Sequence, residues 1–168
     1  MTIDILSAST EKILSKAIKA ESEAVDLYKK LKKSVNNFVL KEKLAFLISE
    51  EKKHHKMLEV LFSKMFPGKS PDRKEKSLIP RLTIALNEEM SVPDMLELGM
   101  EAEKAAEEVY DSLSQEVDER GVQEILQYLA SMEHGHYSLL KGEYDLCIRD
   151  EMYFERGDFQ YDMVHIGP

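Results

Sequence analysis

Apolar residues recur along this chain at alternating spacings of three and four, the period of one face of an α-helix. Four segments show this pattern, at about residues 9–35, 38–66, 92–117 and 122–147. The stretch between the second and third segments, residues 69–92, is polar and longer than an ordinary loop. The pattern therefore predicts an all-α four-helix bundle with a long crossover between its second and third helices.

Helix start and stop signals stand at the ends of these segments. Pro67–Gly68 follows the second segment and is typical of a helix end. Ser91 followed by Pro93 is typical of a helix start. We expect one bundle domain over residues 1–147 and an aromatic C-terminal tail over residues 148–168.

The chain contains an internal repeat. A shift of 82 residues aligns residues 12–60 with residues 94–142 without a gap, and 14 of the 49 positions are identical. Unrelated helices of similar composition would share about four or five. The apolar stripe matches between the halves, and so do polar residues that fall on the predicted buried face, which core packing alone does not require.

Each half of the repeat carries a Glu and, thirty residues later, a Glu-x-x-His pair. The six residues are Glu21, Glu51, His54, Glu103, Glu133 and His136. Three residues take the chain about 300° around a helix, so both side chains of a Glu-x-x-His pair leave the same face. Four inward carboxylates and two inward imidazoles are the ligand set of a di-metal carboxylate site in a four-helix bundle.

Charge arithmetic favours this interpretation. Two divalent cations would neutralise four carboxylates, which would otherwise repel one another on an apolar seam. Oxygen and imidazole ligands suit iron, manganese or zinc better than copper(I). The alternative is a set of buried Glu and His residues that satisfy one another without a metal.

Three further residues of the predicted buried face are candidates for the site. Tyr28 and Tyr110 each follow a candidate ligand by two turns, and each is either a core tyrosine or a hydrogen-bond donor to a ligand carboxylate across the bundle. Glu107 stands one turn from Glu103, where the first half has Val25. Glu107 is either an additional, switching ligand or a residue at the edge of the bundle.

Composition excludes several classes of function. Lys and Arg total 23 against 32 Asp and Glu, and a chain with a net charge of −9 is a poor partner for nucleic-acid phosphates. The single cysteine, Cys147, allows neither an internal disulfide nor a four-thiolate metal site. No segment has the roughly 18 consecutive apolar residues of a membrane helix, and the N-terminus does not resemble a secretory signal. We expect a cytoplasmic protein with no nucleic-acid or membrane partner.

These motifs resemble those of the ferritin-like superfamily, and most closely those of its rubrerythrin-like branch, over roughly residues 8–147. The residues that carry the resemblance are Ala20–Ala24 with Tyr28, Glu51–His54, Glu103 with Tyr110, and Glu133–His136. The resemblance implies a ferritin-like bundle with a non-haem centre of two iron ions. It also implies reduction of hydrogen peroxide, or oxidation of Fe(II) by peroxide or dioxygen.

The chain departs from typical rubrerythrins in two ways. Those proteins add a rubredoxin-like domain whose iron is held by four cysteines, whereas this chain has one cysteine. The resemblance therefore implies that electrons come from an external donor protein such as a rubredoxin. Typical rubrerythrins also carry an extra Glu three residues after the third-helix ligand, where this chain has Ala106. A ligand switch in this chain would depend on Glu107.

The first hypothesis for function is a di-iron peroxide reductase in which Tyr28 and Tyr110 orient ligands or supply protons. The second is a ferroxidase or iron-handling protein that uses the same residues. The third is an interaction protein with a structural metal site. We expect a homodimer or a higher homo-oligomer.

The tail is unusually apolar for a chain end. Its apolar residues are Met152, Tyr153, Phe154, Phe159, Tyr161, Met163, Val164 and Ile166. A plain disordered segment rarely contains so many. The tail is either a frayed terminus or a segment that docks onto a partner or a neighbouring subunit.

Overall fold

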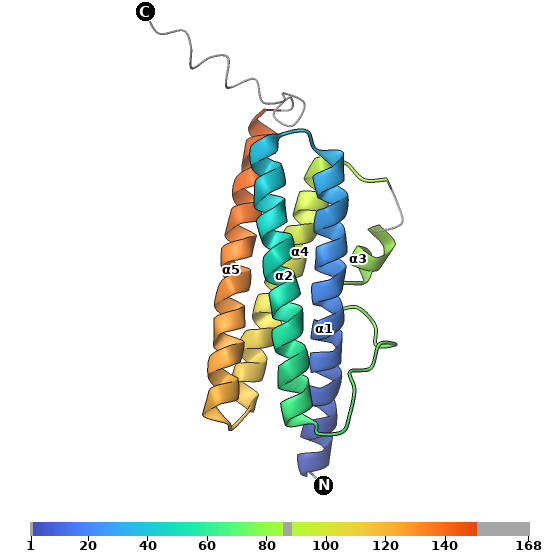
Figure 1. Cartoon of the computed structure of the whole chain (residues 1–168), viewed down its shortest axis with the longest axis vertical. Coiled ribbons are helices and arrows are strands. Elements are labelled where there is room, and N and C mark those ends of the chain that lie inside the picture. The colour runs from blue at the N-terminus through green and yellow to red at the C-terminus, as the bar shows by residue number, and fades with distance from the viewer. Residues whose placement is uncertain (1, 86–88, 151–168) are drawn as a thin grey trace, which may run out of the picture.

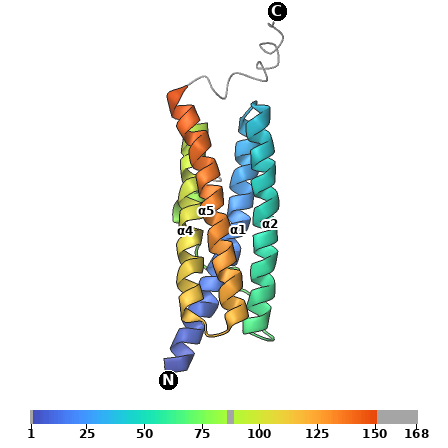
Figure 2. The same cartoon turned by 90° about the vertical axis from the view of Figure 1, so that its left-hand side faces the viewer.

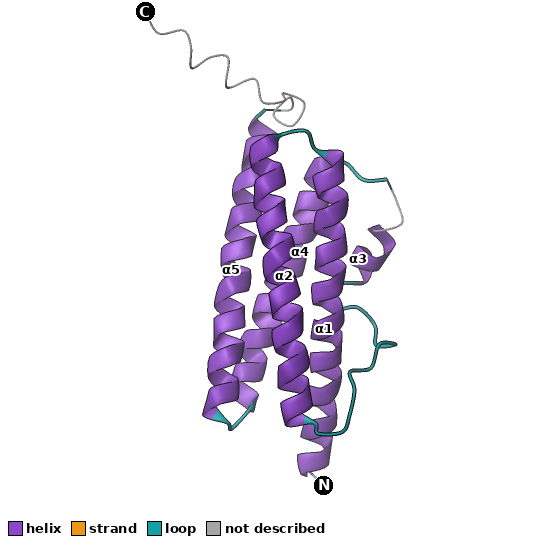
Figure 3. Ribbon diagram, viewed as in Figure 1, coloured by secondary structure: helices purple, strands orange, loops and turns teal. Residues whose placement is uncertain are grey.

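The computed structural model describes residues 2–85 and 89–150 of the 168-residue chain. The helices in these ranges are α1 (Thr2–Ser34), α2 (Phe38–Met65), α3 (Pro80–Ala85), α4 (Val92–Glu116) and α5 (Arg120–Arg149). The described residues contain no strand (Figure 3). The four long helices stand side by side, and the short α3 lies outside them, against α1 and α4 (Figure 1).

The connection between α2 and α4 gives the bundle its topology. α1 and α5 run in one direction along the bundle, and α2 and α4 run in the other (Figures 1 and 2). Because α2 and α4 are parallel, the chain between them must return along the whole length of the bundle. This arrangement confirms the predicted all-α, ferritin-like bundle with a long crossover.

Local signals fix the starts of two helices. The Asn37 side chain accepts a hydrogen bond from the Leu40 backbone N–H at 2.9 Å and caps α2. The Ser91 hydroxyl accepts one from the Asp94 backbone N–H at 3.2 Å, with proline in the first turn of α4. These are side-chain caps of the kind that the sequence near Ser91 predicts.

Two helix ends differ from the prediction. α1 begins at Thr2 and not near residue 9, because no Gly or Pro interrupts the intervening residues. α5 continues to Arg149, two residues past the expected domain boundary. Residues 151–168 of the predicted tail lie outside the described residues, so the division into two domains stays a prediction.

The apolar core consists of two clusters separated along the bundle. One contains Leu27, Leu31, Leu40, Leu44, Leu47, Leu96 and Leu140, among others. The other contains Leu14, Leu58, Leu61, Phe62, Leu113, Leu126 and Leu129, among others. Each cluster draws on both halves of the repeat, so the bundle cannot be divided into two independent hairpins.

Gly99 allows α4 to approach its neighbours closely. A Cβ at this position would lie 3.1 Å from Tyr28 Cε1 and 3.1 Å from Leu140 Cδ1. Both of these side chains are fully buried. Gly99 therefore sets the distance from α4 to α1 and α5 beside Tyr28.

We expect Gly99→Ala to lower the free energy of unfolding by about 1–2 kcal/mol, since crowding of two buried side chains outweighs the gain in helix propensity. Urea denaturation followed by circular dichroism measures this change. Gly142→Ala is the matched control, because nothing lies within 4 Å of a Cβ there. It should stabilise the protein by about 0.5–1 kcal/mol. Equal stabilisation by both substitutions would contradict the close approach at Gly99.

Candidate metal centre

All six ligand candidates lie inside the bundle, between the two apolar clusters. Glu21 lies on α1, Glu51 and His54 on α2, Glu103 on α4, and Glu133 and His136 on α5. None of the six is more than 3% exposed. The repeat thus places a polar layer across the core, with one carboxylate from every long helix.

Four of the six form one compact cluster. Glu51, His54, Glu133 and His136 each offer a ligand atom, and these atoms all lie within 4.8 Å of one another. His54 Nδ1 lies 2.7 Å from Glu133 Oε1, and His136 Nδ1 lies 2.7 Å from Glu51 Oε1. Each histidine therefore faces the Glu of the other half of the repeat.

The histidines also approach the Glu of their own helix. His54 Nδ1 lies 3.3 Å from Glu51 Oε2, and His136 Nδ1 lies 3.2 Å from Glu133 Oε2. The two imidazole rings are stacked, with centroids 5.3 Å apart. The cluster thus has an approximate twofold symmetry that follows from the repeat.

The facing atoms lie at ion-pair distance from one another without forming hydrogen bonds. Both ring nitrogens of His54 and His136, both carboxylate oxygens of Glu133 and Oε1 of Glu51 are buried and lack a hydrogen-bond partner among the described residues. Ligand atoms about 2.1 Å from one cation stand about 3 Å apart when the angle at the cation is about 90°. The observed N···O distances match this spacing, so the residues fit a metal ion.

Glu21 and Glu103 lie outside the four-residue cluster and are held by tyrosines. The Tyr110 hydroxyl of α4 donates a hydrogen bond to Glu21 on α1. Reciprocally, the Tyr28 hydroxyl of α1 donates one to Glu103 on α4. Glu103 Oε2 lies 3.7 Å from His136 Nδ1, at the edge of the cluster. The tyrosine of each half therefore positions the carboxylate of the other half that lies outside the cluster.

Burial and neighbouring charges divide the four carboxyl groups into two classes. Burial raises the pKa of Glu21, and the charges of Glu133 and Glu51 add to that effect. Burial likewise raises the pKa of Glu103, with Glu51 nearby. Burial also opposes ionisation of Glu51, but the two histidines overcome it and lower its pKa to about 2. They lower the pKa of Glu133 for the same reason.

The histidines are protonated in the metal-free site at neutral pH. Burial alone would lower the pKa of His54, but Glu133 and Glu51 overcome that effect and raise it to about 9. For His136, the carboxylates of Glu103, Glu133 and Glu51 overcome burial and raise the pKa to about 12. Two protons therefore balance part of the negative charge that cations would otherwise balance.

The tyrosines remain neutral donors. Burial raises the pKa of Tyr28, and the adjacent Glu103 raises it further. Burial and the adjacent Glu21 raise the pKa of Tyr110 in the same way. A neutral hydroxyl next to a carboxylate fixes the orientation of a ligand carboxylate.

Glu107 does not join this centre. Its carboxylate lies 3.1 Å from Lys104 Nζ and 3.2 Å from His134 Nδ1, on the outside of α4 and α5. Ala106, at the position of the extra Glu of typical rubrerythrins, is buried in an apolar cluster. Of the two interpretations of Glu107, the structure places this residue at the edge of the bundle, where its carboxylate pairs with Lys104 and His134. Around α4, Glu107 is about 40° from Glu103 and about 100° from the buried Ala106.

Sequence reasoning missed Phe46 and Glu143. The Phe46 ring meets the His136 ring edge to face, with centroids 6.2 Å apart. Glu143 is buried on α5 and pairs with Lys43 of α2. A signal existed for Phe46, because the repeat aligns it with the aromatic Tyr128. Glu143 had no such signal, since the repeat aligns it with Leu61.

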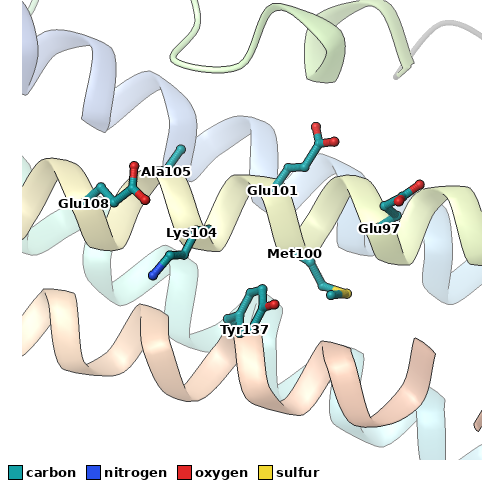
Figure 4. A pocket seen from close by; sticks show the side chains of 7 residues that line it. All are labelled: Glu97, Met100, Glu101, Lys104, Ala105, Glu108 and Tyr137. Carbon is teal, nitrogen blue, oxygen red and sulfur yellow. The ribbon is translucent and has the colours of Figure 1, made fainter. Parts of the chain in front are cut away.

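An open groove lies between α4 and α5 outside the metal centre (Figure 4). Tyr137 of α5 points toward α4 between Met100 and Lys104, with Glu101 and Glu108 on the same stretch of α4. None of the six ligand candidates lines this groove, so it is separate from the cluster.

Comparisons with known proteins agree with this geometry. The rubrerythrin family model matches residues 12–144. A hypothetical protein from Pyrococcus furiosus is similar in structure, with a TM-score of 0.73 and 37% sequence identity, over 83% of this chain and 90% of that one. No curated protein matches the chain. Among the described helices, none is both long and apolar enough to cross a membrane.

We expect Tyr28→Phe and Tyr110→Phe each to lower the free energy of unfolding by about 1–3 kcal/mol, because each leaves a buried carboxyl without its donor. Chemical denaturation of metal-free protein measures the change. Tyr128→Phe is the matched control, since Tyr128 is 51% exposed. No difference between the three substitutions would contradict the positioning role of the two buried hydroxyls.

We expect metal binding to release protons and to weaken as the pH falls. His54 and His136 have raised pKa values of about 9 and about 12, so both are protonated at neutral pH and must lose a proton to bind a metal. The affinity for Mn(II) should therefore rise by about tenfold or more per pH unit between about pH 6 and 8. Calorimetry in buffers of different ionisation enthalpy counts the protons, and a count of zero would contradict the protonated metal-free site.

Proposed function

This chain belongs to the rubrerythrin family, and from that premise we propose that it is a di-iron oxidoreductase that reduces hydrogen peroxide to water with electrons from an external donor protein such as a rubredoxin. The observation that carries the proposal is the cluster of Glu51, His54, Glu133 and His136, whose buried ligand atoms face one another without hydrogen-bond partners. Cations satisfy such a set, because four carboxylates and two imidazoles in an apolar core need a compensating charge.

The residues divide into two groups by role. The four residues of the cluster would hold two iron ions between them, and Glu21 and Glu103 would complete the ligand set from the sides. When bound, iron supplies the two electrons that peroxide reduction consumes and acts as a Lewis acid. The chain itself keeps the site dry, since all six side chains are buried.

The tyrosines hold the outer carboxylates in place during turnover. Each hydroxyl is neutral and hydrogen-bonded to one carboxylate, so Glu21 and Glu103 cannot rotate away without breaking a buried bond. Each hydroxyl also keeps a proton next to a ligand oxygen. These roles need no movement of Glu107, so the proposed reaction uses a fixed ligand set.

Oxidation of Fe(II) as a substrate is the second candidate. The observation that favours it is the position of Glu107, which pairs with Lys104 and His134 outside the cluster. Family members that switch ligands during peroxide reduction need an extra carboxylate, and Ala106 cannot supply one. The two candidates differ in the fate of iron, which stays in the site of a reductase and leaves that of a ferroxidase.

We expect protein prepared without oxygen and loaded with Fe(II) to hold about two irons per chain, as the doubled ligand set predicts. Peroxide should oxidise this iron faster than air does, and reduced rubredoxin should then restore Fe(II) without loss of metal. Elemental analysis and stopped-flow absorbance measure these steps. Release of Fe(III) after each turnover would establish the ferroxidase. Binding of zinc in place of iron, with no reaction with peroxide, would establish a structural site.

Matched variants test which residues iron binding and the peroxide rate require. Glu51→Ala combined with Glu133→Ala should abolish iron binding, because it removes the carboxylate that each histidine of the opposite half faces. Glu107→Ala and His134→Ala should keep the iron content and the peroxide rate within about twofold, as expected of surface substitutions. A large loss of rate in Glu107→Ala would show that this side chain enters the site during the reaction.

A further inference from the structure

The exposed large apolar side chains of the described residues are confined to two of the helices. They are Phe38, Val39, Phe46 and Val60 on α2, and Tyr128, Leu146 and Ile148 on α5. No described side chain of α1 or α4 belongs to this set. Concentration of exposed apolar groups on one side of a protein is typical of a surface that something covers.

Five of these side chains border the seam between α2 and α5, namely Val39, Phe46, Val60, Tyr128 and Leu146. Val39, Phe46 and Val60 are separated by seven and fourteen residues, which places them in one stripe along α2. The contact of Phe46 with the His136 ring shows that this stripe faces α5. The repeat aligns Phe46 with Tyr128, and Leu146 lies about five turns beyond Tyr128 on α5.

The metal centre is least covered by other side chains at the seam between α2 and α5. α2 and α5 pack against α1 and α4 respectively much more closely than against each other. At the level of the cluster, Phe46 is the side chain that stands over His136, and Phe46 is itself 48% exposed. A cover on the seam would therefore shield both an apolar surface and the ligand beneath it.

We propose that residues 151–168 of the same chain fold back along the seam between α2 and α5 and cover Phe46. The segment follows α5, whose last turns carry the exposed Leu146, so it starts at one end of the seam. From Arg149 back to the level of His136 is about 20 Å along the helix. Eighteen extended residues span about 60 Å, so the length suffices.

Composition and charge fit this occupant. The segment supplies eight apolar residues to meet the apolar stripes. It has four acidic residues against one Arg, whereas α2 has six Lys against four Glu. Docking within one chain also avoids the loss of translational freedom that a second molecule would incur. This docking does not depend on which reaction the metal centre performs.

The absence of tryptophan from the chain makes a clean fluorescence test possible. Phe46→Trp places a single indole under the proposed cover. In the full chain its emission should be blue-shifted, and acrylamide should quench it weakly. In a chain that ends at Asp150 the emission should shift to the red and quenching should rise by about twofold or more, as for an uncovered ring. Samples of matched metal content are compared, because bound iron quenches indole.

Two controls separate docking from other effects. Gln127→Trp reports from an exposed position next to Tyr128 but on another face of α5, and truncation should not change it. Phe154→Ser with Phe159→Ser keeps the length and charge of the segment and, combined with Phe46→Trp, should expose the indole as truncation does. Circular dichroism verifies that each variant keeps its helices, and the Ser variant decides the question if the truncated chain does not fold.

Two results would overturn the proposal. Identical emission from the full and truncated Phe46→Trp chains would show that the segment does not reach the seam. Shielding that disappears on dilution, together with a doubled mass in light scattering, would show that a second copy of the chain covers the seam. Shielding that is independent of concentration and lost in the Ser variant supports docking within the chain.

Discussion

The charge of four carboxyl groups buried in an apolar bundle is the constraint on which the rest of this structure depends. Glu51 and Glu133 are ionised next to protonated histidines, whereas burial raises the pKa of Glu21 and Glu103. An apolar core tolerates such a layer only when protons or cations balance it. The two apolar clusters on either side of the layer provide the apolar packing of the bundle.

The repeat balances these buried charges symmetrically, because each half supplies the partners of the other half. Each histidine faces the Glu of the opposite half, and each tyrosine donates to the outer Glu of the opposite half. The shortest polar contacts of the centre therefore cross between the halves. A single half would bury the same charges without their partners, which explains why the two halves form one core and not two hairpins.

Two charged differences between the halves lie away from the ligand atoms. Glu107 takes the place of Val25 but pairs with Lys104 and His134 on the outside. The pair of Lys43 with the buried Glu143 stands where the repeat has Ile125 and Leu61 in the other half. Divergence at these positions does not disturb the charge balance of the centre. The apolar stripes on α2 and α5, in contrast, are shared by both halves at Phe46 and Tyr128.

The sequence by itself determined the helices, the crossover and the identity of the six ligand candidates, because periodicity and the repeat place each of them on a buried face. It could not determine whether Glu107 points inward, because Glu107 is about 40° from Glu103 around the helix and the neighbouring helices decide on which side of the core boundary such a residue falls. It also could not pair Tyr28 with Glu103 or Tyr110 with Glu21, because these contacts join residues far apart in the chain. Only the packing of α1 against α4 decided those partners. Only the wider separation of α2 from α5 left the seam between them exposed.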